Sequence, residues 1–456
     1  MTERERIEQL ERENEELRKE IERLRRQLEE ALRKIRRQAA PFSRNRPKEH
    51  PAQPGRKPGA RYGERSGRPI PSVIEEEWVA ELPERCTHCG GQIVQDAVAQ
   101  QYQEDIVRQK VVRRFAVEIG HCRRCGRRAQ GRHRLQTSEA LGAAAVQIGP
   151  EALVLAAHLS PVMGQSHAKI AQLLQLGYGL TVHRSTLCRA LTRMGRKARP
   201  TYQALRLCVR NSPVAWMDET GWRVAAVLAW LWVVCTQQLS VYVIQRGRGF
   251  AEAAAILGED FAGILHHDGL ALYYGFGQAQ HQSCLAHLVR RCRAMIETAG
   301  SAAPHCFAAR VRELLCQAIA VRQRYEHGEI SLHGMRVAAG RLANGKLDQL
   351  LLEDQRSADN RRLSNHLAHE SPHLLTFVRQ PAAESTNNRA ERELRPAVVA
   401  RKTWGGNRTD TGARTFESLA SVLRTAHLQD QDSFDLLLPL LRSRTPFVLD
   451  LIPDSS

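Results

Sequence analysis

A heptad repeat at the amino terminus constrains the fold of this chain more than any other feature. Two interleaved series, apolar except for one Asn, recur every seven positions: Ile7, Asn14, Ile21, Leu28, Ile35 and Leu10, Leu17, Leu24, Ala31. β-Branched residues in the first series and Leu in the second favour a parallel two-stranded coiled coil, and the single Asn fixes its register. Residues 1–38 are therefore predicted to form a homodimeric coiled coil, with a solvated single helix as the alternative.

Basic charge is concentrated in two windows after this helix. The chain carries 67 Lys and Arg against 49 Asp and Glu, a net charge of +18 over 456 residues. Residues 41–70 hold eight basic and two acidic residues, and residues 105–134 hold ten basic and two acidic residues. A surface that binds a polyanion concentrates charge in this way. Nucleic acid is therefore the expected partner.

The first basic window lies in a segment that is rich in proline. Residues 39–72 contain seven prolines among Arg, Lys and Gly, a composition that buries too little apolar surface to fold alone. We expect a flexible basic linker that contacts phosphates without sequence preference, or a plain spacer.

Four of the eleven cysteines stand in two C-x-x-C-G motifs. Paired thiolates form one half of a tetrahedral zinc site, and the Gly permits the tight turn, so two motifs complete a structural Zn²⁺ site. The four expected ligands are Cys86, Cys89, Cys122 and Cys125. Residues 73–136 are predicted to form a zinc ribbon with a hairpin strand over 107–119; His88 and His121 are alternative ligands.

Basic side chains in this region are expected to contact DNA. On the ribbon they are Arg123, Arg124, Arg127 and Arg128. Residues 137–208 are predicted to form a helical module that resembles a helix-turn-helix. Its first helix covers 166–176, and its second begins at Thr181 or Ser185 and carries Arg184 and Arg189. A helical hairpin that does not bind DNA is the alternative.

Extended apolar runs replace the helical periodicity after residue 209. The runs are 213–217, 228–235, 241–244 and 262–265, with helical segments over 250–257 and from Gln282 onward. Three strands, a helix and a further strand predict an α/β fold with a ribonuclease H-like core. We assign this core to residues 209–292 and 384–427.

Two carboxylates, Asp218 and Asp268, directly follow predicted strands. Carboxylate oxygens are the hard ligands that Mg²⁺ prefers, and two such ions can bind both oxygens of a phosphoryl displacement. The neighbouring Glu219 should point to the opposite face of its strand. A simple turn-forming role for either aspartate is the alternative.

Four motifs carry a resemblance to a known family. They are W-M-D-E-T-G-W at 216–222, D-G-L-A-L-Y at 268–273, C-L-A-H-L-V-R at 284–290 and T-N-N-R-A-E-R-E-L-R-P at 386–396. With them the chain resembles the transposases of the insertion sequence 66 family over nearly its whole length. The family's motif at this place is Asp-Gly-Tyr, and this chain has Leu270 in place of the Tyr. The change lies two residues after Asp268 and leaves its carboxylate unaltered.

This resemblance implies a DDE transposase that uses two Mg²⁺ or Mn²⁺ ions. The implied ligands are Asp218, Asp268 and Glu391, and the implied reactions are cleavage of transposon ends and strand transfer to target DNA. Accessory proteins of the same element are possible partners. The residues alone leave Glu384 and Glu393 open as alternatives to Glu391. An acidic residue at position 391 is also favoured by the dipole of a helix capped by Asn387 or Asn388, so a purely structural role for Glu391 is a further alternative.

The spacing of the three acids predicts an insertion in the core. Asp218 and Asp268 are 50 residues apart, whereas Asp268 and Glu391 are 123 apart. Residues 293–383 keep helical periodicity and are expected to form a helical insertion, followed after the core by a tail over 428–456. Side chains near Glu391 are expected to bind DNA, with a solvated helix face as the alternative: Arg389, Arg392, Arg395, Arg401, Lys402 and Trp404.

Cys284 and His287, three residues apart on a predicted helix, are expected to pack and orient rather than bind a metal. Neither a signal peptide nor a membrane-spanning apolar run is present, so we expect a cytoplasmic, nucleoid-associated protein. A catalytically inactive dimeric DNA-binding regulator is the rival interpretation. A ribonuclease H-type nuclease that cuts hybrids is a third.

Overall fold

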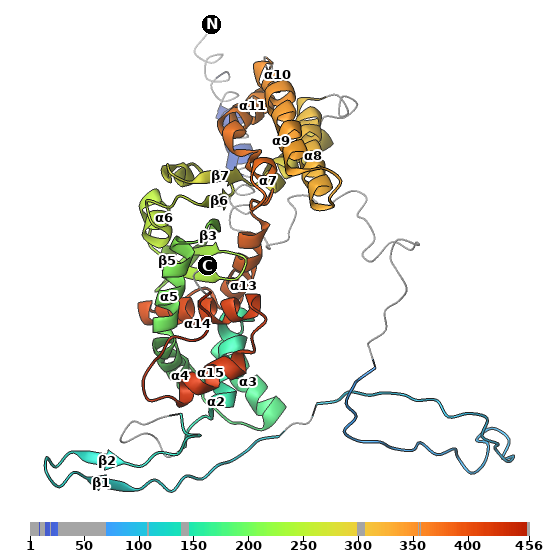
Figure 1. The fold of residues 1–456 in the computed structure, drawn as a ribbon, viewed down its shortest axis with the longest axis vertical. Coiled ribbons are helices and arrows are strands. Elements are labelled where there is room, and N and C mark those ends of the chain that lie inside the picture. Colours follow the sequence, from blue (N-terminus) through green and yellow to red (C-terminus); the bar gives the residue numbers. More distant parts are fainter. Residues whose placement is uncertain are drawn as a thin grey trace. The chain divides into compact units, whose positions relative to one another are not determined.

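The computed structural model divides the chain into two units, Met1–Arg108 and Gln109–Ser456. Figure 1 labels the helices and strands along the chain. The described residues are 9, 14–18, 20–25, 70–106, 109–137, 146–298, 306–353, 355 and 357–453.

The first unit contains part of the heptad repeat. Residues 14–18 and 20–25 are helical, and three apolar seam residues, Leu17, Ile21 and Leu24, are 63%, 50% and 51% exposed. An exposed apolar seam is what a coiled-coil strand presents to its partner. The remaining seam positions and residues 39–69 of the linker lie outside the described residues, and dimerisation stays a prediction.

A five-stranded mixed sheet forms the centre of the second unit. Its strands are β3 (Val214–Val224), β4 (Val227–Cys235), β5 (Ser240–Gln245), β6 (Ile264–His267) and β7 (Gln280–Ser283). The strand order is β5-β4-β3-β6-β7. Strands β3, β4 and β5 pair antiparallel, whereas β6 runs parallel to β3 and β7 parallel to β6. This mixed α/β topology is compatible with the predicted ribonuclease H-like core.

Two local expectations about the sheet are wrong. Asp218 lies inside β3 and not at its end, because residues 219–224 continue the antiparallel pairing with β4 as far as Val224 and Val227. Gln282 lies in β7, where it pairs with His266, and the helix begins only at Leu285. In both places pairing with a neighbouring strand extends the backbone beyond the apolar run.

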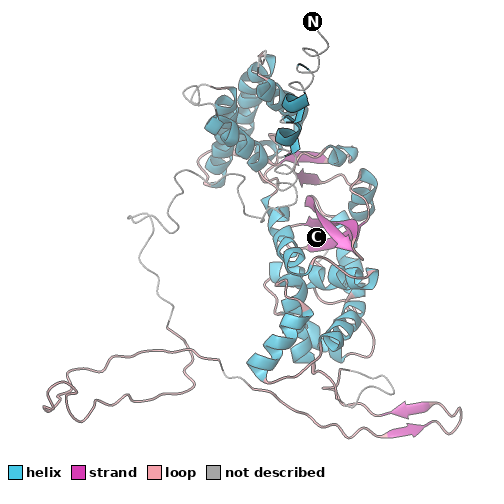
Figure 2. Cartoon of the chain, turned by 180° about the vertical axis from the view of Figure 1, so that it is seen from behind, coloured by secondary structure: helices cyan, strands magenta, loops and turns pink. Residues whose placement is uncertain are grey.

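Helices cover both faces of the sheet (Figure 2). On one face, α13 (Asn388–Trp404) and α14 (Asp410–Leu428) pack against alternate β3 residues such as Trp216 and Trp222. On the other face, α5 (Arg199–Arg210) and α6 (Phe250–Leu257) share a buried cluster with Met217. The alternation of β3 side chains thus buries both faces.

The helices that precede the sheet belong to the same buried cluster. They are α2 (Pro150–Ala157), a π-helix (His158–Val162), α3 (His167–Tyr178) and α4 (Arg184–Lys197). The expected tail over 428–456 is wrong, because it forms α15 (Ser433–Arg442). Leu437 and Leu440 of α15 are fully buried in this cluster, so the segment completes the core.

The helical hairpin over α3 and α4 has the predicted turn but a different cap. Ser166 caps α3, and Gly179 ends it at φ 64° in the left-handed region that Gly adopts without a steric penalty. The N-cap of α4 is His183, whose Nδ1 accepts from the Ser185 amide at 3.3 Å. Thr181 and Ser185 are therefore not the cap.

A second helical group with its own core follows β7. The expected insertion over 293–383 lies in this group, but the group begins earlier, since Leu285 and Leu288 belong to its buried cluster. It comprises α7 (Leu285–Thr298), α8 (Phe307–Glu326), α9 (Leu332–Arg341), a π-helix (Leu342–Leu347), α10 (Asp348–Leu352), α11 (Ala358–Glu370), a 3₁₀ turn (Ser371–His373) and α12 (Thr376–Arg379). Thr376 Oγ1 donates to the His281 carbonyl at 2.6 Å, which ties α12 to β7. Within the described part of the chain, none of the helices combines the length and apolar character that a membrane span requires.

Candidate active site

Asp218 occupies the middle of β3 and is partly buried. Its Oδ1 accepts from the Glu219 amide at 2.8 Å. Burial raises the pKa of Asp218 well above its usual range, and the nearby carboxylates of Glu219, Asp268 and Glu391 raise it further. The structure therefore brings the three acids of the predicted triad within electrostatic reach of one another.

Asp268 directly follows β6, as predicted. Its Oδ1 accepts from the Leu270 amide at 3.0 Å, so the turn around Gly269, at φ 92°, orients the carboxylate. Leu270 contributes its backbone amide to this contact, which any residue other than Pro supplies.

Glu391 lies in the first turn of α13, and Asn387 holds that turn against the sheet. Asn387 is fully buried; its Nδ2 donates to the Met217 carbonyl at 2.9 Å, and its amide donates to Cys284 Sγ at 3.2 Å. Asn387 is the N-cap by position, but its side chain makes no cap hydrogen bond. Its side chain instead joins α13 to β3 one residue before Asp218.

Glu384 and Glu393, the alternatives to Glu391 by sequence, are engaged elsewhere, and so is Glu219 beside Asp218. Glu219 pairs with Arg248 at 2.8 Å on the opposite face of β3, where the Tyr273 hydroxyl also donates to it. Glu384 forms an ion pair with Arg389 at 2.8 Å, and Glu393 forms one with Arg424 at 2.7 Å. Glu391 differs, because its buried Oε1 has no hydrogen-bond partner among the described residues.

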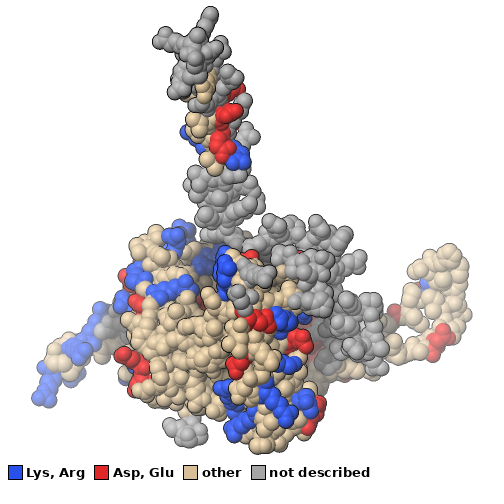
Figure 3. All heavy atoms as spheres, turned by 90° about the horizontal axis from the view of Figure 1, so that it is seen from above, with Lys and Arg blue, Asp and Glu red and all other residues tan. Residues whose placement is uncertain are grey.

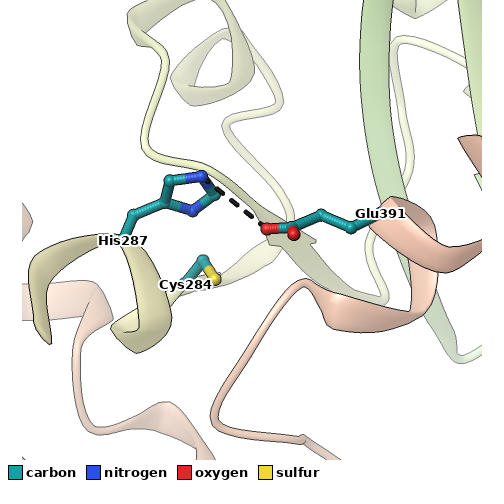
Figure 4. Close-up of side chains that lie close together, drawn as sticks. All are labelled: Cys284, His287 and Glu391. Atoms are coloured by element: carbon teal, nitrogen blue, oxygen red, sulfur yellow. Dashed lines mark ion pairs between the residues drawn. The ribbon is translucent and has the colours of Figure 1, made fainter. Parts of the chain in front are cut away.

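Two further side chains point toward Glu391 (Figure 4). His287 Nε2 lies 3.7 Å from Glu391 Oε1. Donor atoms of Cys284, His287 and Glu391 all lie within 4.8 Å of one another, so these residues could hold a metal ion together. Cys284 is buried, which raises the pKa of its thiol, and it already accepts from Asn387. These contacts agree with the packing and orienting role expected for Cys284.

His266 connects the strands that carry the site. It is fully buried and stacks on Trp216 at a ring distance of 4.4 Å. The Glu384 amide donates to Nε2 at 2.9 Å, so Nδ1 carries the proton and donates to the Ala215 carbonyl at 3.2 Å. Burial lowers the pKa of His266 to about 4. The imidazole is thus neutral and links β6, β3 and the segment leading to Glu391.

Acidification should therefore destabilise the second unit through His266. Between its unfolded pKa of about 6.5 and its folded pKa of about 4, the unfolded chain binds more protons, so stability falls as the pH drops. We expect His266 alone to contribute a loss of about 2 kcal/mol between pH 7 and pH 5. Urea unfolding at both pH values measures it, and a His266→Gln variant, which does not titrate, should lose that part of the dependence. Equal pH dependence in both proteins would contradict the assignment.

The predicted DNA-binding residues of α13 divide into two groups. Arg392, Arg395 and Lys402 are exposed on the outer side of the helix. Arg389 instead lies over Trp216, 4.9 Å from the ring centroid, and Arg401 donates to the β3 backbone at Gly221. The first group lies on the exposed face of α13, whereas the inward pair connects the helix to the sheet. Contact of the first group with DNA stays a prediction.

Trp404 packs in an aromatic cluster at the end of α13. Its ring lies 5.7 Å from that of Trp222 and 6.1 Å from that of Phe416. The side chain is only partly exposed. Its stacking on a base stays a prediction, and its packing against the sheet is observed.

The second C-x-x-C-G motif lies between two short strands, β1 (Ile119–His121) and β2 (Arg128–Gln130). The expected strand over 107–119 is wrong where the chain is described, since Ile119 is its only residue in a strand. Among the described residues, the hairpin continues before it only through the Gly131 amide, which donates to the Glu118 carbonyl at 2.8 Å. Lys and Arg side chains gather along this segment (Figure 3). The predicted contacts are all exposed: Arg123, Arg124, Arg127 and Arg128.

Each C-x-x-C-G motif forms the same turn within its own unit. The Gly90 amide donates to the Cys86 carbonyl and the Gly126 amide to the Cys122 carbonyl, each at 2.8 Å. The Cys89 amide lowers the pKa of Cys86, and the Cys125 amide lowers that of Cys122. Both turns therefore favour thiolates. The sharing of one zinc ion by the two motifs stays a prediction.

Comparison with known proteins identifies the chain's family. The family model described as Transposase IS66 family matches residues 146–415, more than half of the chain. The chain belongs to this transposase family. The matched range contains the sheet, the helical insertion and all three acids.

One curated relative of this IS66-family chain is an uncharacterized protein, y4jD, from Sinorhizobium fredii (strain NBRC 101917 / NGR234). The two are 26% identical over 328 residues, which is 64% of this chain. The chain spans 62% of the length of that relative.

Sequence reasoning missed two residues that shape this site. His266 gave no signal beyond its position before Asp268. Glu370 lies about a hundred residues away in sequence and contacts the Asp268 turn only in the folded chain. Such contacts depend on how the insertion docks.

Proposed function

We propose that the chain is a DNA transposase that cleaves transposon ends and transfers them to target DNA. Asp218, Asp268 and Glu391 are its catalytic carboxylates, on a ribonuclease H-like core. The observation that supports this most directly is that three carboxylates from separate elements lie within electrostatic reach of one another. Burial raises the pKa of Asp218, and the charges of Glu219, Asp268 and Glu391 raise it further. A cluster of like charges at a sheet is stable when cations bind it.

The donor set fits Mg²⁺ or Mn²⁺. All three side chains offer oxygen, which these hard ions prefer. Glu391 Oε1 is buried without a hydrogen-bond partner among the described residues, so it retains its capacity to coordinate. When bound, a pair of such ions would activate the attacking oxygen and stabilise the leaving oxygen of an in-line displacement.

The protein's own residues orient these groups. Asn387 holds the first turn of α13 beside β3, and the Leu270 amide fixes one oxygen of Asp268. Arg392, Arg395 and Lys402 face solvent on the helix that carries Glu391. We propose that they bind DNA phosphates near the scissile bond, because guanidinium and ammonium groups match phosphate in charge and geometry.

Other contacts with DNA are proposed on α4 and on the β1–β2 hairpin. Arg184 and Arg189 are exposed on α4, while Leu187 and Leu191 on its other face are buried. This amphipathic arrangement suits a recognition helix. We also propose structural Zn²⁺ at Cys86, Cys89, Cys122 and Cys125, and dimerisation through the heptad repeat.

A nicking assay tests the proposed function. The full chain is incubated with DNA that carries the element's terminal inverted repeats, with Mg²⁺ or with EDTA. The transposase predicts metal-dependent nicks at the repeat ends and joined products. Binding without nicks would favour an inactive DNA-binding regulator, and cleavage of hybrids without joining would favour a ribonuclease H-type nuclease.

Neutralising the β1–β2 hairpin should weaken DNA binding in a salt-dependent manner. Replacing Arg123, Arg124, Arg127 and Arg128 by Ala removes four exposed charges, and the log–log salt slope should fall by about 0.9 for each of these side chains that neutralises a phosphate. A fluorescence anisotropy titration at several salt concentrations measures the slope. The control replaces Arg361 and Arg362, which are exposed on the insertion. An unchanged slope in the hairpin variant would remove this segment from the DNA interface.

A further inference from the structure

A buried carboxylate of the helical insertion contacts the turn that carries Asp268. Glu370, the last residue of α11, is 1% exposed. Its two oxygens accept from different elements: the Tyr274 hydroxyl donates to Oε1, and the Ser283 hydroxyl donates to Oε2. Tyr274 belongs to the 3₁₀ turn after Asp268, and Ser283 ends β7.

The same carboxylate supports the backbone of Gly269. A Cβ at Gly269 would lie 3.3 Å from both Glu370 oxygens, so the turn passes directly over the carboxylate. Gly269 has a φ of 92°, which L side chains rarely adopt. Glu370 thus contacts the residue next to Asp268, together with elements that follow it along the chain.

The charge of Glu370 is poorly compensated for a buried carboxylate. Its ion-pair partner among the described residues is His366, whose Nε2 lies 3.9 Å from Oε1. Burial lowers the pKa of that imidazole, which disfavours its charged form. Burying a carboxylate with two hydroxyl donors and no close cation costs stability.

A chain of neutral histidines holds the other side of the turn. The Gly269 amide donates to His267 Nδ1 at 3.1 Å, so His267 Nε2 carries the proton and donates to His281 Nδ1 at 3.1 Å. His281 Nε2 then donates to the Phe276 carbonyl at 3.1 Å. The turn is therefore held between this chain and Glu370.

We propose that Glu370 is a positioning residue through which the helical insertion sets the geometry of Asp268. The proposal rests on the proposed function for the role of Asp268, but the contacts themselves do not. The insertion thereby contributes a residue that shapes the site. Cys284 follows Ser283 and contacts Asn387, so the same network reaches the helix of Glu391.

The test compares three variants of the full chain: Glu370→Ala, Glu370→Gln and Glu353→Gln. The last is the matched control, since Glu353 is also an ion-paired insertion carboxylate, bound to Arg310 away from the core. Hydrogen–deuterium exchange of peptides over 266–276 reports the turn without requiring activity. We expect Glu370→Ala to accelerate exchange there on the order of 10- to 100-fold, because two buried hydroxyls and the turn lose their support.

Glu370→Gln should restore much of the protection from exchange over 266–276, because the amide keeps the shape of the side chain and one acceptor. The control, Glu353→Gln, should exchange like the wild type.

In nicking assays, Glu370→Ala should require more Mg²⁺ for half-maximal cleavage while DNA binding is unchanged. Unchanged exchange over 266–276 would overturn the proposal, because Glu370 would then not support the turn. Equal acceleration over 307–326 would also overturn it, because Glu370 would then stabilise the protein as a whole and not the turn in particular. If the wild type does not nick DNA, the proposed function fails, and the exchange result still decides the positioning role.

Discussion

Replacing Asp218, Asp268 or Glu391 by Asn or Gln should reduce metal-dependent cleavage of transposon-end DNA by at least about 10³-fold, because bound metal ions contribute several kcal/mol to such reactions. Binding to the ends should stay close to wild type, since the proposed phosphate contacts lie on other side chains. The readout is single-turnover cleavage of labelled end DNA together with a binding titration.

Thermal stability separates this effect from misfolding. The carboxylates of Glu219, Asp268 and Glu391 raise the pKa of Asp218, so removing one of these charges relieves repulsion, and the melting temperature without metal should not fall. Glu259→Gln, which removes an exposed charge after α6, is the matched control and should cleave normally. If the Glu391→Gln protein still joined strands, Glu391 would not belong to the catalytic set.

Replacing Glu393 by Ala should reduce stability, in contrast to the three substitutions above. We expect a loss of about 3–5 kcal/mol in the free energy of unfolding. Glu393 is 3% exposed, and Arg424 donates to both of its oxygens at 2.7 and 3.0 Å. The Tyr242 hydroxyl donates to the Glu393 carbonyl at 2.7 Å in the same buried cluster. Removing the carboxylate leaves the guanidinium buried without its partner. Urea unfolding measures the loss.

An exposed ion pair provides the comparison for Glu393. Glu353→Ala removes one partner of the partly exposed Arg310–Glu353 pair, and such pairs contribute about 0–1 kcal/mol. Replacing both Glu393 and Arg424 by Leu should recover much of the loss, because no unpaired charge then remains. If Glu393→Ala and Glu353→Ala were equally stable, the buried pair would not contribute as the geometry indicates.

Glu391 and Glu393 show where sequence reasoning stops without a family resemblance. Both lie near the start of α13, and either suits the positive end of a helix. Two positions apart on a helix, they point in different directions. Glu391 meets His287 and the acid cluster, whereas Glu393 meets Arg424 of α14. Only the packing of α13 between β3 and α14 assigns them different roles.

Local patterns predicted much of the fold. The helix over 250–257 has the predicted bounds, and the runs over 228–235 and 241–244 lie in strands β4 and β5, because apolar periodicity and chain-breaking residues are local properties. The strand β7 and the continuation of β3 beyond Asp218 were not predicted. The residues of β7 are polar, and those after Asp218 mix polar residues with the apolar Trp222 and Val224. Pairing with neighbouring strands, and not composition alone, makes both segments extended.

The sequence by itself determined the strand that precedes Asp268 and, through its motifs, the family, and it proposed the three acids. Tertiary structure alone decided that these acids lie within electrostatic reach of one another, that Asn387 joins α13 to β3, and that residues 428–453 complete the core instead of forming a tail. It also placed Glu370 beneath the Asp268 turn. The physical reason is that periodicity reports which face of an element is buried, whereas contacts between side chains a hundred residues apart arise only when those faces pack.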